Sequence, residues 1–462
     1  MEYGAYIAQK LTRVPPTGIS EGFSVPGSLF PHQSALTAWA IRRGRAAIFA
    51  DTGLGKSRMQ IAWADAVRRY TKRPVLILAP LAVAQQTVAE AAELGMTIAH
   101  CRDQADVRDS YIAVTNYDRL HRFDPSHFDG VVLDESSCIK HHDAKTLRTL
   151  LEAFRDTPFK LCATATPAPN DWTELGTHAE FLGICTRQEM LAEFFTHDGG
   201  DTSVWRLKGH ARHLFWQWVS TWGAMVRKPS DLGFDDSAYA LPPLHLHEHT
   251  VKTEMPLNGM LFAAEAQTLS ERRDARRLSV DDRVRECAAI VNGEASESWV
   301  VWCDLNAEGD ALTKAISGAV QIAGADSAEV KEQRLAAFAA GKFRVLVSKP
   351  SICGFGLNWQ HSARMAFVGV TDSFESYYQA VRRCWRFGQK RDVHVHVFAS
   401  SAEGAVVANL RRKERDAALM AESLSAETRD AVMAEVTGLK RQTNTYNAAQ
   451  RVAVPAFLKD AA

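Results

Sequence analysis

The chain carries the stretch Ala50-Asp51-Thr52-Gly53-Leu54-Gly55-Lys56-Ser57 between an apolar run, residues 46–50, and a segment, residues 59–67, with apolar side chains at helical spacing. A strand, a glycine-rich loop and a helix in this order form the context of a phosphate-binding loop. Glycine lets the backbone turn tightly and approach an anion without a Cβ atom in the way. A glycine-rich turn with a surface lysine is the alternative, but it leaves this order of elements unexplained.

We predict that the loop binds the phosphates of ATP through six residues, Thr52, Gly53, Leu54, Gly55, Lys56 and Ser57. The amide groups of the loop and the N-terminus of the following helix are expected to face the phosphates. Lys56, also a candidate catalytic residue, is expected to reach the outer phosphates, and the Ser57 hydroxyl to hold Mg²⁺. Gln33 lies ahead of the loop, and its amide can pair with both the acceptor and the donor edges of adenine.

The composition of the 462 residues fits a folded protein with two or three domains. Apolar residues make up 46% of the chain, which is enough for sizeable cores. Lysine plus arginine and aspartate plus glutamate both number 54, so the formal net charge is zero. Any surface that binds nucleic acid must therefore be local, built from a few basic clusters.

The eight cysteines include no Cys-x-x-Cys pair, which argues against a zinc ribbon and against a disulfide framework. Scattered cysteines fit a reducing compartment. The N-terminal residues show no basic segment followed by an apolar core, so no signal peptide is expected. No apolar run approaches membrane-spanning length. We therefore expect a soluble protein of the cytoplasm.

Strand-like apolar runs recur after the loop, at residues 74–80, 111–117, 130–133 and 161–165. A helical pattern, residues 82–94, separates the first two runs. This alternation predicts a doubly wound parallel sheet, whose ligand binds at the carboxyl ends of the strands. The phosphate-binding loop and the polar residues that end the later runs fall on that edge.

Two adjacent carboxylates, Asp134 and Glu135, end one of these runs. We predict that Asp134 holds Mg²⁺, directly or through water, and that Glu135 orients and deprotonates the attacking water. A strand cap that faces solvent is the alternative for an Asp-Glu pair. The apolar run before the pair and the phosphate-binding loop upstream favour the catalytic role.

Three stretches in the first half of the chain resemble motifs of superfamily 2 helicases and translocases, specifically those of the Swi/Snf group. They are residues 51–57, similar to Asp-x-x-Gly-Leu-Gly-Lys-Thr/Ser; residues 134–140, similar to Asp-Glu-x-His-x-Ile-Lys; and residues 166–170 with Glu174-Leu175, similar to the third motif with its trailing Asn and Glu-Leu. Gln33 matches the adenine-contacting glutamine of the group. Ser137 stands where the group usually has a histidine.

The second half of the chain contains one more motif-like stretch, residues 379–389, which reads Gln-Ala-Val-Arg-Arg-Cys-Trp-Arg-Phe-Gly-Gln. It resembles the sixth Swi/Snf motif, Gln-x-x-x-Arg-x-x-Arg-x-Gly-Gln, and under that match Arg383 and Arg386 are arginine fingers. A planar cation fixed against the transferring phosphoryl group can contribute about 10³–10⁵ in rate. Arg382 does not match the motif. Residues 354–358 resemble the fifth motif, which contacts the nucleic-acid backbone and the nucleotide cleft.

Strands and helices alternate again in the second half, with strand-like runs at residues 299–304, 319–324, 343–348 and 365–370. No second phosphate-binding loop accompanies them. This half is therefore expected to complete the site of the first half rather than to bind a nucleotide of its own. The predicted fold class is α/β, with two tandem RecA-like lobes, parallel sheets flanked by helices, and helical insertions.

We expect five segments along the chain. They are a leader, residues 1–25; a first, ATP-binding lobe, residues 26–235, with a helical insertion at about residues 176–235; a linker and helical arm, residues 236–285; a second lobe, residues 286–404; and a C-terminal helical tail, residues 405–462.

Aromatic side chains gather in residues 171–240, where Phe215, Trp218 and Trp222 have the spacing of one helical face. Such a stripe indicates core packing more often than a base-stacking platform.

The histidines of residues 245–249 alternate along the chain, so a strand would place His245, His247 and His249 on one face, as metal ligands require. No cysteine lies nearby, and we do not expect a metal site there.

The resemblance implies a motor that binds ATP and Mg²⁺ between its lobes and moves along duplex DNA without full strand separation. Because the chain lacks room for the large chromatin-reading domains of eukaryotic members, we expect a small bacterial or phage protein. ATP is expected to close the cleft, because only a closed form gives the γ-phosphate its contacts with Arg383 and Arg386. An RNA helicase of the DEAD type is disfavoured, because its box would read Asp-Glu-Ala-Asp and its sixth motif would end Gly-Arg. An ATP-gated clamp or adaptor that does not translocate stays open as an alternative.

Overall fold

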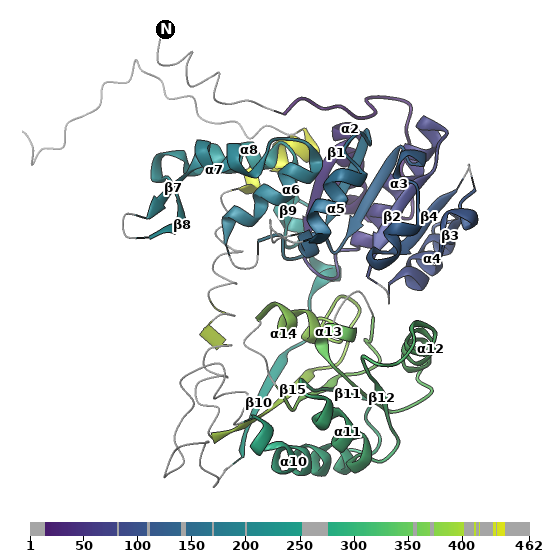
Figure 1. Cartoon of the computed structure of the whole chain (residues 1–462), viewed down its shortest axis with the longest axis vertical. Coiled ribbons are helices and arrows are strands. Elements are labelled where there is room, and N and C mark those ends of the chain that lie inside the picture. Colours follow the sequence, from purple (N-terminus) through teal and green to yellow (C-terminus); the bar gives the residue numbers. More distant parts are fainter. Residues whose placement is uncertain are drawn as a thin grey trace, which may run out of the picture.

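The computed structural model describes residues 14–80, 83–108, 111–139, 145–168, 171–198, 201–251, 276–353, 358–369, 374–401, 411–412, 415, 428–430 and 432–438. In this part of the chain two lobes form, each around a parallel sheet with helices on both faces (Figure 1). The predicted α/β fold with two tandem RecA-like lobes is confirmed. Among these residues no helix is both long and apolar enough to cross a bilayer.

The first lobe contains a seven-stranded sheet in the order β3-β4-β2-β5-β6-β1-β9. Its strands are β1 (Arg45–Ala50), β2 (Val75–Ala79), β3 (Ile98–His100), β4 (Ile112–Asn116), β5 (Gly130–Asp134), β6 (Phe159–Ala163) and β9 (Gly223–Val226). Most of them are apolar and buried along their whole length, as a parallel sheet covered on both faces requires. The strands pair in parallel, so their carboxyl ends meet at one edge.

The described helices of the first lobe contribute to two cores, one on each face of its sheet. Helices α2 (Pro31–Arg43), α3 (Lys56–Thr71) and α4 (Ala84–Glu93) contribute to the core on one face. Helices α5 (Lys145–Ala153), α6 (Leu175–Leu182), α7 (Arg187–Phe194) and α8 (Arg212–Ser220) contribute to the core on the other. Because helices cover both faces of the sheet, a ligand is expected at the edge where β1 and β5 end. This is the edge that the sequence predicts to bind the nucleotide.

The second lobe contains a six-stranded sheet in the order β10-β15-β14-β11-β13-β12. Its strands are β10 (Leu244–Val251), β11 (Trp299–Trp302), β12 (Ala319–Ile322), β13 (Val345–Ser348), β14 (Arg364–Phe367) and β15 (Val393–Ser400). Its helices are α10 (Val280–Gly293), α11 (Asn306–Ala315), α12 (Ala328–Ala339), α13 (Pro350–Cys353) and α14 (Phe374–Val381). Strand β10 lies in the segment predicted as a linker, yet it pairs with β15 as an edge strand of this sheet.

The insertion predicted as helical, residues 176–235, also contains strands. Strands β7 (Phe195–Asp198) and β8 (Asp201–Leu207) form an antiparallel hairpin that extends from the first lobe (Figure 1). Strand β9 lies in the central sheet beside β1. The aromatic stripe is not one helical face, because α8 ends at Ser220 and Trp222 comes after it. Phe215 and Trp222 are buried, and Trp218 packs against the same core.

Two described stretches of the predicted C-terminal tail, residues 428–430 and 432–438, return to the first lobe. Val432 and Val436 of these stretches pack into the same core as Leu232. Two ion pairs, Glu435 with Arg43 and Arg429 with Asp231, add to this contact. The chain therefore completes the first lobe with residues that come after the second.

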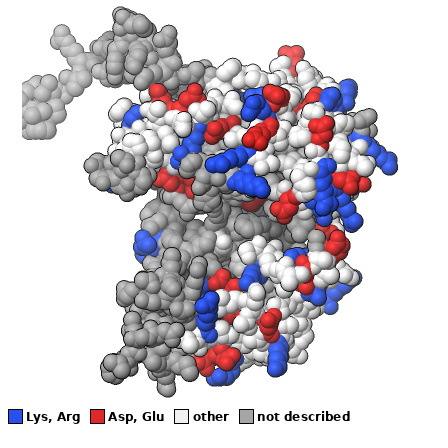
Figure 2. Space-filling model, in the orientation of Figure 1, with Lys and Arg blue, Asp and Glu red and all other residues white. Residues whose placement is uncertain are grey.

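Charged side chains of both signs are interspersed on the face of the molecule seen in Figure 2. Lys and Arg side chains lie among Asp and Glu side chains on both lobes in that view. This distribution agrees with the zero formal net charge of the sequence. Attraction of a polyanion to this face would have to come from local clusters.

Candidate nucleotide-binding site

The phosphate-binding loop connects β1 to α3. Gly53 and Gly55 have φ angles of 94° and 80°, in the left-handed region that residues with a Cβ atom rarely adopt. Helix α3 begins at Lys56 without a side-chain cap, which leaves its first amide groups to an anion. Lys56 Nζ donates to the carbonyl oxygens of Ala50 at 2.8 Å and Asp51 at 3.4 Å. Burial lowers the pKa of Lys56, and nearby carboxylates oppose this shift.

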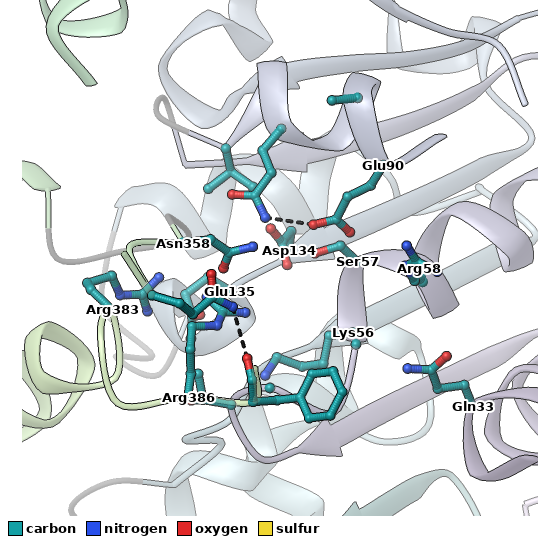
Figure 3. Close-up of a pocket in the computed structure, with 18 of the residues that line it drawn as sticks. Gln33, Lys56, Ser57, Arg58, Glu90, Asp134, Glu135, Asn358, Arg383 and Arg386 are labelled. Carbon is teal, nitrogen blue, oxygen red and sulfur yellow. Dashed lines mark hydrogen bonds between the residues drawn. The ribbon is translucent and has the colours of Figure 1, made fainter. Parts of the chain in front are cut away.

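Asp134 ends β5 at the sheet edge beside the loop. Gln60 of α3 donates its amide to Asp134 Oδ1 at 2.7 Å, and burial raises the pKa of Asp134 to about 6. Ser57 and Asp134 both line the cavity shown in Figure 3. A hydroxyl and a carboxylate are oxygen ligands of the kind that Mg²⁺ prefers, so these two residues fit the predicted metal.

Glu135 lies one residue beyond β5 with a φ angle of 55°, a strained conformation that non-glycine residues adopt only where the surroundings enforce it. Glu135 Oε1 accepts hydrogen bonds from Thr164 Oγ1 at 2.7 Å and from Ser137 Oγ at 3.3 Å. Thr164 comes directly after β6, so the ends of two neighbouring strands hold the carboxylate. The bond from Thr164 links the Asp-Glu box to the residue two positions before the third motif, whereas Ser137, in the place of the usual histidine, bonds within the box.

A histidine does reach the Asp-Glu box, but from a distant part of the sequence. His178 Nε2 of α6 lies 3.1 Å from Ser136 Oγ, and both side chains are buried. Burial lowers the pKa of His178 to about 4, so its ring is neutral at physiological pH. No motif indicates this residue, because the contact depends on how α6 packs against the residues that follow β5.

Arg383 and Arg386 reach the same cavity from the second lobe, in the turn after α14. Gln379 holds Arg383, since its carbonyl oxygen accepts from Nε at 2.8 Å and its Oε1 accepts from Nη2 at 3.0 Å. Burial lowers the pKa of Arg383 to about 10 and the pKa of Arg386 to about 9. Both guanidinium groups therefore stay cationic at neutral pH.

A cavity of about 530 Å³ lies between the lobes. It is lined by ten of the predicted site residues: Gln33, Thr52, Gly53, Gly55, Lys56, Ser57, Asp134, Glu135, Arg383 and Arg386. Figure 3 shows the two arginines beside Glu135, on the side of the cavity away from Gln33 and Arg58. Leu54 differs from the other loop residues, because its side chain is buried in the core of the first lobe.

Gln33 lines the cavity, but its amide is bonded within the protein. Its Oε1 accepts from the backbone amide of Phe30 at 3.1 Å, and its Nε2 donates to the carbonyl oxygen of Leu54 at 3.0 Å. A Cβ atom on Gly55 would lie 2.1 Å from Gln33 Nε2. Pairing with adenine requires the amide to exchange these partners, and it stays a prediction.

Sequence motifs did not indicate several other residues that line the cavity. They are Arg58, Gln86, Glu90 and Gln360, whereas Asn358 and Phe387, which also line the cavity, lie within the stretches that resemble the fifth and sixth motifs. Most lie on helix faces or beside a motif, where no fixed spacing identifies them. Phe387 packs closely on the loop, since a Cβ atom on Gly53 would lie 2.9 Å from Phe387 Cβ. Residues 354–357, Lys140 and residues 169–170 lie outside the described part of the chain.

The histidines of β10 pair with residues of β15 and the turn before it. His245 Nε2 lies 3.0 Å from Asp392 Oδ2, His247 Nε2 lies 2.9 Å from His394 Nδ1, and His249 Nε2 lies 3.0 Å from His396 Nδ1. In the described residues no group of three His, Cys, Asp or Glu side chains is arranged to hold a metal ion. These histidines form a stacked ladder across two strands instead.

The fold and the cavity together define a two-lobed nucleotide-binding protein, in which one lobe supplies the phosphate-binding loop and the other supplies arginines. Two family models match this chain. The SNF2-related domain matches residues 32–208, and the helicase conserved C-terminal domain matches residues 285–388. The chain is a Swi/Snf-like member of the superfamily 2 helicases, a family of ATP-hydrolysing enzymes.

One solved structure similar to this chain is the Sulfolobus solfataricus SWI2/SNF2 ATPase core in complex with dsDNA. It has 17% sequence identity and a TM-score of 0.42, and the match covers 88% of this chain and 98% of that chain. No curated protein matches the chain.

Proposed function

We propose that this protein is an ATP-dependent motor that moves along duplex DNA. The observation that carries the proposal is the cavity that both lobes line, with Lys56 and Glu135 on one side and Arg383 and Arg386 on the other. A γ-phosphate that contacts both lobes holds them together, and its removal by hydrolysis releases them. Repeated closing and opening would shift the lobes along a nucleic-acid backbone that lies across both.

Five residues of the cavity have distinct roles in this mechanism. Ser57 and Asp134 would hold Mg²⁺, which neutralises charge on the β- and γ-phosphates when it is bound. Glu135, fixed by Thr164, orients the attacking water and takes its proton. Arg383 and Arg386 stabilise the charge that develops on the phosphoryl oxygens.

Lys56 changes its partners in this mechanism. It donates to two loop carbonyl oxygens in this structure, and it would exchange them for phosphate oxygens when ATP binds. Its positive charge then lies where the phosphates are most negative, and this contact contributes to binding as well as to hydrolysis.

The assignment of DNA rests on the Swi/Snf motifs. Tracking of a nucleic-acid backbone needs few base contacts, so sequence specificity should be low and the dependence on salt strong. The zero net charge of the chain means that a local surface has to supply the phosphate contacts.

Steady-state ATP hydrolysis tests the proposal when it is measured without nucleic acid and with single-stranded DNA, duplex DNA and RNA. Glu135→Gln serves as the blank, and removal of Mg²⁺ by a chelator should abolish the signal. We expect strong stimulation by duplex DNA alone. Stimulation only by single strands or by RNA would instead indicate a strand-separating helicase.

Displacement of a triplex-forming strand separates a motor from an ATP-gated clamp. A motor removes the third strand as it advances, whereas a clamp hydrolyses ATP and leaves the strand in place. We expect displacement that depends on ATP and on Glu135.

A further inference from the structure

A network of hydrogen-bonded side chains joins the phosphate-binding loop of the first lobe to the arginine-bearing segment of the second. Asp51 Oδ2 lies 2.6 Å from Arg382 Nη2, and Asp51 Oδ1 accepts from the Tyr378 hydroxyl at 2.8 Å. The Tyr378 hydroxyl in turn accepts from Arg382 Nε at 3.1 Å. We call Asp51, Tyr378 and Arg382 the interlobe triad.

The interlobe triad is shielded from water. The side chain of Arg382 is 7% exposed and that of Asp51 is 22% exposed. The Arg382 guanidinium lies 5.3 Å from the centre of the Tyr378 ring and 5.0 Å from that of the Trp385 ring. Burial acts to raise the pKa of Asp51, but Arg382 and Tyr378 hold it below its ordinary value. Asp51 is therefore an ionised partner, and the pair is only weakly screened by salt.

The interlobe triad is connected to the candidate site in both lobes, to the phosphate-binding loop through Asp51 and to the arginine-bearing segment through Arg382. Asp51 Oδ1 also accepts from the backbone amide of Thr52 at 2.6 Å, so the carboxylate is part of the loop conformation. Arg382 directly precedes Arg383 and lies four residues before Arg386 in the same turn. A displacement of Arg382 relative to Asp51 would therefore move both arginines relative to the phosphate-binding loop.

The position of Arg382 in the sequence separates this role from the arginine-finger role. Arg382 does not belong to the pattern Gln-x-x-x-Arg-x-x-Arg-x-Gly-Gln, and it does not line the cavity. An arginine that only stabilised the fold would pair within its own lobe, as Arg364 does with Glu294 at 2.9 Å. Arg382 crosses to the other lobe, and its partner is a residue of the nucleotide-binding loop.

We propose that Asp51 and Arg382 are positioning residues that set the distance between the phosphate-binding loop and the arginine fingers, and that they hold the lobes in contact before ATP binds. The proposal rests on the proposed hydrolysis of ATP in this cavity. It goes beyond it by making lobe contact a property of the nucleotide-free protein.

Charge-changing variants test the proposal, with Arg382→Gln and Asp51→Asn as single changes and Asp51→Arg with Arg382→Asp as the reversal. We expect each single change to lower kcat by about 10²-fold, because small misplacement of a catalytic group has effects of that size. KM for ATP should change much less, since the groups that bind the phosphates remain. The reversal should restore part of kcat. Arg364→Gln, which breaks an ion pair within one lobe, is the matched control and should leave kcat unchanged.

The distance between the lobes is a second readout that does not depend on hydrolysis. Fluorescence energy transfer between dyes on non-natural residues at Lys72 and Lys314, both exposed, reports it in the nucleotide-free protein. We expect lower transfer in both single variants and recovery in the reversal, with unchanged thermal unfolding. Unchanged transfer, or a loss of kcat that merely tracks a loss of stability, would overturn the inference. Absent hydrolysis in the wild type would instead refute the proposed function, while the transfer measurement still tests the triad.

Discussion

The two lobes turn from a buried strand into a helix in different ways. In the first lobe, β1 leads through the glycine loop to α3, which starts without a side-chain cap. In the second lobe, β11 leads to α11, and Glu308 Oε2 of that helix accepts from the backbone amides of Asp304 at 2.8 Å and Leu305 at 2.9 Å. One lobe thus carries its own anion at this turn, and the other leaves its amides to a phosphate.

The built-in anion of the second lobe is itself neutralised. Glu308 pairs with Arg283 at 2.7 Å, and neither side chain is exposed to solvent. Such a buried pair leaves no place for a nucleotide at the turn into α11. The comparison agrees with the proposal of one ATP site between the lobes, since the second lobe contributes Arg383 and Arg386 to the cavity instead of a phosphate-binding loop of its own.

The largest expected effect tests whether the second lobe supplies catalytic arginines to the site of the first lobe. Arg386→Ala is expected to lower kcat by about 10³–10⁵-fold, the range measured for arginine fingers. The affinity for ATP should fall far less, since the phosphate-binding loop is intact. Arg391→Ala is a suitable control, because Arg391 pairs with Glu297 on the surface of the second lobe. A kcat within about tenfold of the wild type would contradict the assignment of Arg386.

Glu308→Gln should destabilise the second lobe by about 3–5 kcal/mol, because it leaves Arg283 buried without a counter-charge. Denaturant unfolding measures this loss, and binding of a fluorescent ATP analogue to the first lobe should be retained in conditions where the variant is folded. Glu286→Gln on α10 is the control, since that side chain is 42% exposed. Equal stability of the two variants would show that the buried pair of Glu308 with Arg283 does not stabilise the turn into α11.

Gly55→Ala sharpens the comparison in the first lobe, because the loop needs both the left-handed backbone and the space beside Gln33. The strained φ angle should cost about 1–3 kcal/mol of stability, and displacement of Gln33 should weaken ATP binding by about tenfold. Gly95→Ala is the matched control, with a φ angle of 71° and no atom within 4 Å of an added Cβ. The control should lose stability but keep its affinity for ATP, as measured by calorimetric titration.

The smallest expected effect concerns the edge of the second sheet at acidic pH. Burial, together with repulsion from His247, His249 and His394, lowers the pKa of His396 to about 3. The unfolded chain binds a proton on this residue near pH 6.5, so the stabilising contribution is complete above that pH and is lost as the pH falls towards 3. His396→Phe should reduce this dependence in unfolding experiments between about pH 8 and pH 4. Parallel pH curves for wild type and variant would refute the explanation.

The sequence allowed the fold class and ten of the residues that line the cavity to be predicted because most of their signals are local. The strands of parallel sheets are short apolar runs. Asp134 and Glu135 come directly after such a run, and Lys56 and Ser57 come at the end of the glycine-rich loop that follows another. Arg383 and Arg386 were found through a motif, and the structure brings them to the same cavity. Their chemical roles remain predictions.

The residues that were missed depend on contacts between distant segments. Gln60 lies mid-helix and His178 lies on α6, and neither has a spacing that relates it to the Asp-Glu box. The sequence places β10 in a linker, because its alternating histidines do not reveal its partner β15. The interlobe triad was missed for the same reason, since its members come from different lobes.

The return of the chain to the first lobe has a consequence for how the protein is made. Val432 and Val436 fill part of the core that also contains Leu232, and they leave the ribosome after every strand of the second sheet. The lobe that is synthesised first is therefore the last to finish packing. During translation its exposed apolar surface has to be tolerated or protected until the second lobe has already been built.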